Sequence, residues 1–189
     1  MPRAFAEIAF TPSVQSIQQR QGSASSYAKL LKPEVNGGNI LTQREAEFIA
    51  ERDGFYQATV SETGWPYVQF RGGPVGFLKV LSDTPIGYAD FRGNRQYVSV
   101  GNLSQEDRIS LILMDYPNRR RLKIMGHVTM VDVADDSAVV DRLRDQNYDA
   151  MSERGVIITI DAFDWNCPQH IPQRYTLDEI ENLTDRELR

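Results

Sequence analysis

The sequence has one cysteine, only two histidines, and fewer basic than acidic residues. The single Cys167 excludes an internal disulfide, which fits a reducing compartment, so we expect a cytoplasmic protein. The two histidines and the cysteine show no HxxxH or CxxC spacing, and we therefore predict no bound metal. The 26 acidic and 21 basic residues give a formal charge of −5, which argues against nucleic acid as a partner.

Long apolar runs are also absent. No segment approaches the ~20 apolar residues needed to span a bilayer, and the start "MPRAFAEIAF" lacks the apolar region of a signal peptide. We therefore expect no membrane association. The glycine-rich "GGPVG" (72–76) does not have the G-x-G-x-x-G spacing of a dinucleotide fold, and neither a P-loop nor a G-x-S-x-G motif occurs.

The chain is long enough for one domain with a substantial core. Six segments rich in Val, Ile, Phe and Tyr, and bounded by Gly, Pro or Asn, predict strands. These segments are 55–61, 65–72, 85–91, 108–116, 121–133 and 155–165. The first two are joined by "ETG", a hairpin signal. Mostly antiparallel strands with helices at the edges and ends predict a mainly β, α+β fold: a small β-barrel with α additions.

Helices are predicted around these strands. The segments are 12–31 with an interruption near Gly22, 41–54, 94–103, 135–145 and 176–188. Thr42 with Glu45, and Thr176 with Glu179, form capping-box patterns, and Gly54 is a plausible helix stop.

The segment "YADFRGNRQY" (88–97) gathers cations on a predicted strand-to-helix turn. Gly93 would permit positive φ and close backbone approach. If a helix begins near Asn94, its free N–H groups attract an anion, and Arg92 or Arg95 can bind a phosphate. The alternative is a solvated turn capped by Asn94. The residues alone leave both interpretations open.

Two further clusters carry candidate ligands. In "NRRRLKIMGHV" (118–128), Arg121 and Lys123 share one face of a predicted strand, where two cations require an anionic or accepting partner. Their neighbours Arg119 and Arg120 are better explained by an exposed hairpin tip. In "DWNCPQHIPQR" (164–174), an aromatic beside several hydrogen-bonding side chains suits a planar heterocycle, although Trp165 could instead plug the barrel.

The segments "WPYVQFRGGPVGFLKVL", "YADFRGNRQYVSVGNL", "DYPNRRRLKIMGHV" and "DWNCPQHI" together resemble, in this order, the FMN-binding split-barrel proteins related to pyridoxamine 5'-phosphate oxidase. The resemblance covers about residues 42–175. It implies a six-stranded antiparallel split β-barrel with flanking helices, and a homodimer that binds FMN in a cleft between protomers. Residues 1–41 would be an N-terminal helical extension, 42–175 the FMN-binding domain, and 176–189 a C-terminal helix.

The resemblance also implies the residues that bind the cofactor. These are Val68, Gln69, Arg71, Ala89, Asp90, Gly93, Asn94, Arg95, Arg121, Lys123, Trp165, Gln169, His170 and Arg174. Within this set Gly93, Asn94 and Arg95 match the turn that holds the FMN phosphate, and Arg121 and Lys123 match a strand that approaches the flavin ring. The family's Ser-Arg-Lys triplet is Gly93-Asn94-Arg95 here, so pyridoxamine phosphate is not the expected substrate.

The implied function is an FMN-dependent oxidoreductase that transfers hydride or electrons between NAD(P)H, or another donor, and a small molecule. Arg121 or Lys123 would stabilise the negative charge of the reduced flavin. We identify no catalytic residue; in particular, Cys167 is not expected to be a nucleophile. The alternative is a non-catalytic protein that stores or senses flavin, haem or a related cofactor. A module that has lost its cofactor is disfavoured because Gly93, Asn94 and Arg95 are retained.

Overall fold

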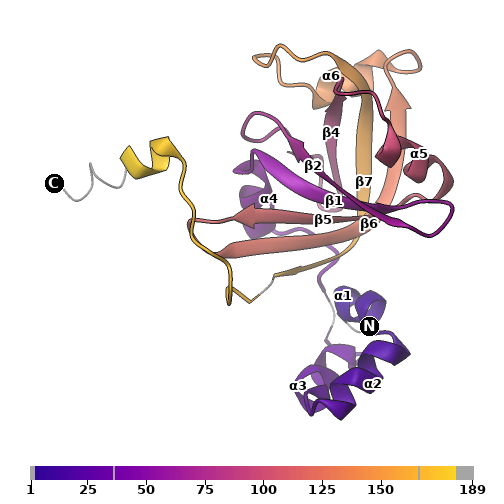
Figure 1. Cartoon of the computed structure of the whole chain (residues 1–189), viewed down its shortest axis with the longest axis vertical. Coiled ribbons are helices and arrows are strands. Elements are labelled where there is room, and N and C mark those ends of the chain that lie inside the picture. Colours follow the sequence, from indigo (N-terminus) through magenta and orange to yellow (C-terminus); the bar gives the residue numbers. More distant parts are fainter. Residues whose placement is uncertain (1–2, 36, 166, 182–189) are drawn as a thin grey trace.

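A computed structural model describes residues 3–35, 37–165 and 167–181, and it contains one seven-stranded antiparallel sheet (Figure 1). The strand order is β2-β1-β5-β6-β7-β4-β3. The strands are β1 Gly54–Val60, β2 Pro66–Gly72, β3 Lys79–Val80, β4 Pro85–Phe91, β5 Arg108–Asp115, β6 Arg120–Asp132 and β7 Ser152–Trp165.

The six predicted strands are confirmed, and so is their antiparallel pairing. The predicted hairpin is also present: Ser61 N donates to Trp65 O over 2.9 Å, and Gly64 takes a φ of 84°. A seventh strand, β3, was not predicted because only two of its residues pair with β4. Among the described residues no pairing joins β2 to β3, so the sheet is open rather than a closed six-stranded barrel.

The sheet bends over its own core. The long strands β6 and β7 run through both halves, and their register shifts at a bulge between Met125 and Gly126. Figure 1 shows β4 and the upper part of β7 crossing β1 and β5 steeply. Alternate side chains fill the space between, and the fully buried ones include Phe55, Tyr88, Leu111, Leu122 and Ile124.

The predicted helices agree with the structure except at their ends. They are α2 Pro12–Arg20, α3 Ala24–Ala28, η1 Lys29–Leu31, α4 Gln43–Ala50, α5 Val98–Gln105 and α6 Ser137–Leu143. The interruption at Gly22, with φ of 75°, and the Thr42–Glu45 capping box are confirmed. Gly54 is not the stop of α4 but the first residue of β1. The C-terminal helix is described only for 177–181, and the rest of that prediction lies outside the described residues.

The N-terminal helices form a separate cluster beside the sheet (Figure 1). The additional helix α1, Ala4–Ala9, packs on β7 through the buried Ala6. Phe163 N donates to Gly38 O over 2.6 Å, which fixes the following loop to the same strand. No helix in the described part of the chain is long and apolar enough to cross a membrane.

Candidate functional site

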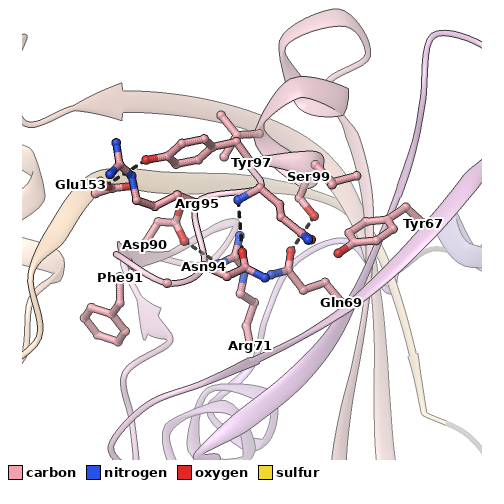
Figure 2. A pocket seen from close by; sticks show the side chains of 14 residues that line it. Tyr67, Gln69, Arg71, Asp90, Phe91, Asn94, Arg95, Tyr97, Ser99 and Glu153 are labelled. Atoms are coloured by element: carbon pink, nitrogen blue, oxygen red, sulfur yellow. Dashed lines mark hydrogen bonds and ion pairs between the residues drawn. The ribbon is translucent and has the colours of Figure 1, made fainter.

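A cavity of about 230 Å³ lies where β2, the β4–α5 turn and β7 meet (Figure 2). Its lining combines cations, two carboxylates, amides and aromatic rings, so it is strongly polar. The lining residues are Tyr67, Gln69, Arg71, Asp90, Phe91, Gly93, Asn94, Arg95, Gln96, Tyr97, Val98, Ser99, Val100 and Glu153.

Strand β2 supplies one wall by simple alternation. Tyr67, Gln69 and Arg71 line the cavity, whereas Val68 and Phe70 lie on the opposite face of the strand and are exposed. The hydroxyl of Ser99 donates to Gln69 Oε1 over 2.9 Å. Because this bond occupies the amide oxygen, the Nε2 group of Gln69 stays a donor toward the cavity.

The floor of the cavity is a buried ion cluster. Asp90, 4% exposed, lies 2.7 Å from Arg71 Nη1 and 2.7 Å from Arg154 Nη1. Arg154 extends this cluster to Asp132 over 3.2 Å. The Nε of Arg71 is buried and has no hydrogen-bond partner among the described residues. One donor of Arg71 is therefore unused in this arrangement.

The turn between β4 and α5 holds two non-glycine residues in the left-handed region. Arg95 has φ of 61° and Tyr97 has φ of 54°, and Asn94 Oδ1 accepts from Gln96 N over 3.2 Å. Gly93, which would permit positive φ, does not adopt it. The prediction of a helix start near Asn94 is also wrong, because left-handed Tyr97 is the N-cap and α5 begins at Val98. The first turn of α5 still borders the cavity.

The side chain of Glu153, a residue of β7, binds this turn. Its Oε1 accepts from Arg92 Nε over 2.9 Å and from the Tyr97 hydroxyl over 3.1 Å. Desolvation acts to raise the pKa of Glu153, but these two bonds and the charges of Arg154 and Arg92 together leave the pKa below its ordinary value. The hydrogen bond to the Tyr97 side chain raises the pKa of the exposed Arg95. Figure 2 shows Arg95 and Tyr97 reaching toward Glu153.

Six of the fourteen predicted ligands line this cavity: Gln69, Arg71, Asp90, Gly93, Asn94 and Arg95. Ala89 is buried beside it and borders an adjacent small cavity. The structure brings these residues together from β2, β4 and the following turn. The other predicted ligands do not line the cavity within one chain.

Arg121 and Lys123 lie on β6, with Leu122 and Ile124 buried on the other face as the alternation predicts. Lys123 Nζ lies 3.2 Å from Asp164 Oδ2 and 4.0 Å from the centroid of the Phe5 ring. The accepting partner that the sequence required for Lys123 is thus present in the same chain.

The C-terminal candidates are dispersed. Trp165 Nε1 donates to Glu45 Oε1 over 2.6 Å, and its ring packs on Phe48. Gln169 and His170 are exposed in the following loop, and the guanidinium of Arg174 stacks 5.0 Å from the ring centroid of Tyr116. None of these side chains borders the cavity.

Several lining residues were missed in the sequence. Tyr67 could have been found, because it alternates with Gln69 and Arg71 along β2. Tyr97, Ser99 and Glu153 could not, because their positions depend on the late start of α5 and on a register shift in β7.

The family model of pyridoxamine 5'-phosphate oxidase matches residues 41–165. A sequence search of curated proteins found no match. Among solved structures, a candidate pyridoxamine 5'-phosphate oxidase from Lactobacillus delbrueckii is 19% identical, with TM-score 0.51 over 67% of this chain and 94% of its own. An FMN-binding protein from Syntrophomonas wolfei is 12% identical, with TM-score 0.51 over 79% and 97%.

HupZ from Group A Streptococcus is 13% identical, with TM-score 0.50 over 72% of this chain and 100% of its own. At these identities the three solved structures show the shared fold alone. The family match spans all seven strands of the sheet and every element around the cavity. The chain therefore belongs to the pyridoxamine 5'-phosphate oxidase family.

Proposed function

We propose that the protein is an FMN-binding oxidoreductase whose cavity holds the phosphate end of the flavin. The observation that carries this proposal is the convergence of Arg71, Arg95 and the first turn of α5 on one cavity. A phosphate monoester is recognised by guanidinium groups and by the free N–H groups at a helix start. The family and the printed description of the Syntrophomonas wolfei protein support FMN as the ligand.

The donors present fit a phosphate. The buried Nε of Arg71 has no hydrogen-bond partner in the described part of the chain, and Gln69 has its Nε2 directed away from the Ser99 contact. The carboxylates that line the cavity are already paired, Asp90 with two arginines and Glu153 with Arg92. Their negative charge is therefore offset before a ligand enters, and Arg95 adds a further cation.

The cavity is too small for the whole cofactor. Its volume of about 230 Å³ is below the roughly 300–1,000 Å³ of pockets that enclose a ligand of this size. The flavin ring would extend beyond it and be covered by other residues. Val68, Ala89, Arg121, Lys123, Trp165, Gln169, His170 and Arg174 remain the candidates for that role, and those after β5 would reach the ring from a second copy.

A homodimer is part of this proposal. The outer face of β1, β2 and β5 exposes a group of large apolar side chains that one chain leaves uncovered: Tyr56, Val68, Phe70 and Ile112. Such a patch is typical of an association surface. We propose that the six long strands form the family's split barrel, with β3 as an addition, and that two such units bury this patch.

FMN, when bound, would supply the hydride or electron transfer. The residues of this chain have simpler tasks. Arg71 and Arg95 neutralise the phosphate, Gln69 donates to the ligand, and the buried pairs of Asp90 keep Arg71 in place. NADH, NADPH or another donor would reduce the flavin for an unidentified small molecule.

The experiment is a visible spectrum of the purified protein, followed by FMN and riboflavin titrations and by anaerobic addition of NADH or NADPH. Flavin absorption, tighter binding of FMN than of riboflavin, and bleaching by a nicotinamide are the expected results. Failure to bind FMN would overturn the proposal. Binding without bleaching by any donor would instead indicate a flavin carrier or sensor.

A further inference from the structure

At the rim of the cavity, strand β7 contains one residue more than β4, the strand with which it pairs. Asp90 pairs with Arg154, but the next residue, Phe91, pairs with Ser152, so Glu153 is the extra residue of a bulge. A bulge redirects the side chain at that point. Glu153 and its neighbour Arg154 consequently approach each other, with 3.7 Å between Oε2 and Nη2, instead of pointing to opposite faces.

The bulge directs Glu153 to both ends of the turn between β4 and α5. Arg92, the first residue after β4, and Tyr97, the N-cap of α5, donate to the same oxygen, Oε1. Glu153 is largely covered, with 14% of its side chain exposed. Between these two anchored residues lies Arg95 in the left-handed region, which is unfavourable for a residue with a β-carbon. This strained backbone must be held by its surroundings.

Two physical effects make opposite predictions for Glu153. As a negative charge at an anion site, it should repel a phosphate, and its removal should tighten binding. As the residue that fixes both ends of the turn, it should preorganise Arg95 and the N–H groups of α5, and its removal should weaken binding.

We propose that the second effect dominates, so that Glu153 is a positioning residue for the phosphate end of FMN although it is an acid in an anion site. Its carboxylate is neutralised by Arg92 and Arg154, which limits the repulsion. Two other contacts each hold one end of the turn: Arg92 N donates to Met151 O over 2.8 Å, and the guanidinium of Arg154 lies 5.4 Å from the ring centroid of Tyr97. Glu153 holds both ends with one carboxylate oxygen. This inference rests on the proposed function for its ligand, but the anchoring of the turn is a property of the chain itself.

The test compares Glu153→Ala, Glu153→Gln and Tyr97→Phe with the unchanged protein. The matched control is Glu106→Ala, because Glu106 also accepts from an arginine Nε, that of Arg108 over 2.7 Å, and does not line the cavity. Affinities for FMN and riboflavin are measured by fluorescence titration. Amide hydrogen exchange of residues 93–97 is measured without ligand, and thermal unfolding shows that each variant is folded.

We expect Glu153→Ala to weaken FMN binding by about tenfold, or about 1.4 kcal/mol, with little change for riboflavin. Amide exchange of residues 93–97 should be faster in Glu153→Ala. Glu153→Gln keeps an accepting oxygen, so its FMN affinity and its exchange rates should lie between those of Glu153→Ala and the unchanged protein. Tyr97→Phe, which removes one of the two anchors, should be intermediate. Equal or tighter FMN binding by a folded Glu153→Ala protein would overturn the proposal.

A failure of the proposed function can be distinguished from a failure of the positioning role. If the unchanged protein does not bind FMN, the function is wrong, and the exchange rates still decide whether Glu153 anchors the turn. Faster exchange in Glu153→Ala would support the positioning role. Unchanged exchange would reject it.

Discussion

The indole Nε1 of Trp165 donates a 2.6 Å hydrogen bond to Oε1 of Glu45, which ties the last residue of β7 to the first turn of α4. Glu45 is 4% exposed, and its other oxygen accepts from the backbone N and the hydroxyl of Thr42. One carboxylate therefore caps a helix and fixes the tryptophan that the sequence suggested as a cofactor contact.

Replacing Glu45 should destabilise the fold. Glu45→Ala removes half of a capping box, and it leaves the indole N–H of Trp165 without its partner. Together these losses lower the free energy of unfolding by about 2–3 kcal/mol, as measured by urea denaturation. Glu47→Ala, on the exposed side of the same helix, should stay within about 0.5 kcal/mol. Equal effects of the two changes would show that the Trp165 contact contributes nothing.

Glu45 should also make the stability of the fold depend on pH in the acidic range. Burial acts to raise the pKa of Glu45, but the hydrogen bonds from Thr42 and Trp165 lower it below the ordinary value. A lowered folded-state pKa stabilises the protein above the unfolded-state value, and this contribution disappears as the pH falls through the folded-state pKa. Glu45→Gln should therefore lose less stability than the unchanged protein between about pH 5 and pH 3.

Arg95→Ala should reduce FMN affinity selectively. Because the Arg95 side chain is exposed, the expected loss is about tenfold, at the lower end for an arginine–phosphate contact. Riboflavin lacks the phosphate, so its affinity should barely change. Fluorescence titrations of both ligands give the answer, with Arg108→Ala as an exposed arginine away from the cavity. Equal losses for FMN and riboflavin would exclude Arg95 as a phosphate ligand.

His127 should make stability depend on pH near neutrality. Its Nδ1 lies 2.8 Å from Asp107 and its Nε2 lies 3.2 Å from Asp161. The hydrogen bond to Asp107 is the main reason that its pKa is raised, with Asp161 adding to the effect and Arg108 opposing it. The protonated ring therefore stabilises the folded state fully below about pH 6.5, and this contribution is lost as the pH rises through the elevated pKa.

The effect is small because the side chain of His127 is 48% exposed. We expect the free energy of unfolding to fall by less than about 1 kcal/mol between about pH 6 and pH 8. His127→Gln should flatten this part of the urea-denaturation profile. A profile that keeps its slope in His127→Gln would assign the dependence to other groups.

The protein should be a dimer in solution. Light scattering at micromolar concentration is expected to give about twice 21.5 kDa. Phe70→Asp places a charge beside Tyr56, 5.3 Å from ring to ring, in the exposed apolar group and should produce monomers. Val133→Asp, at an exposed apolar position outside that group, is the control. A clean monomer that binds FMN tightly would contradict the shared site.

The strands were predictable because their apolar and β-branched residues alternate with polar ones, as along 108–115, where one face is buried. The start of α5 was not predictable, because it follows Tyr97 in the left-handed conformation. That conformation depends on tertiary contacts, and no sequence pattern around Tyr97 indicates it. Six of the fourteen residues that line the cavity followed from the motifs on β2, near the end of β4 and in the turn after it. The contribution of β7 did not, since Glu153 reaches the cavity only through the bulge.

The bulge at Glu153 also affects how relatives should be compared. Its position depends on the number of residues between Gly155 and Met151 rather than on their chemical type. A relative with one residue fewer here would present a different side chain to the turn, even where an ungapped alignment places an acid opposite Glu153. A functional assignment transferred along this family should therefore rest on the spacing of β7 as well as on the identity of its residues.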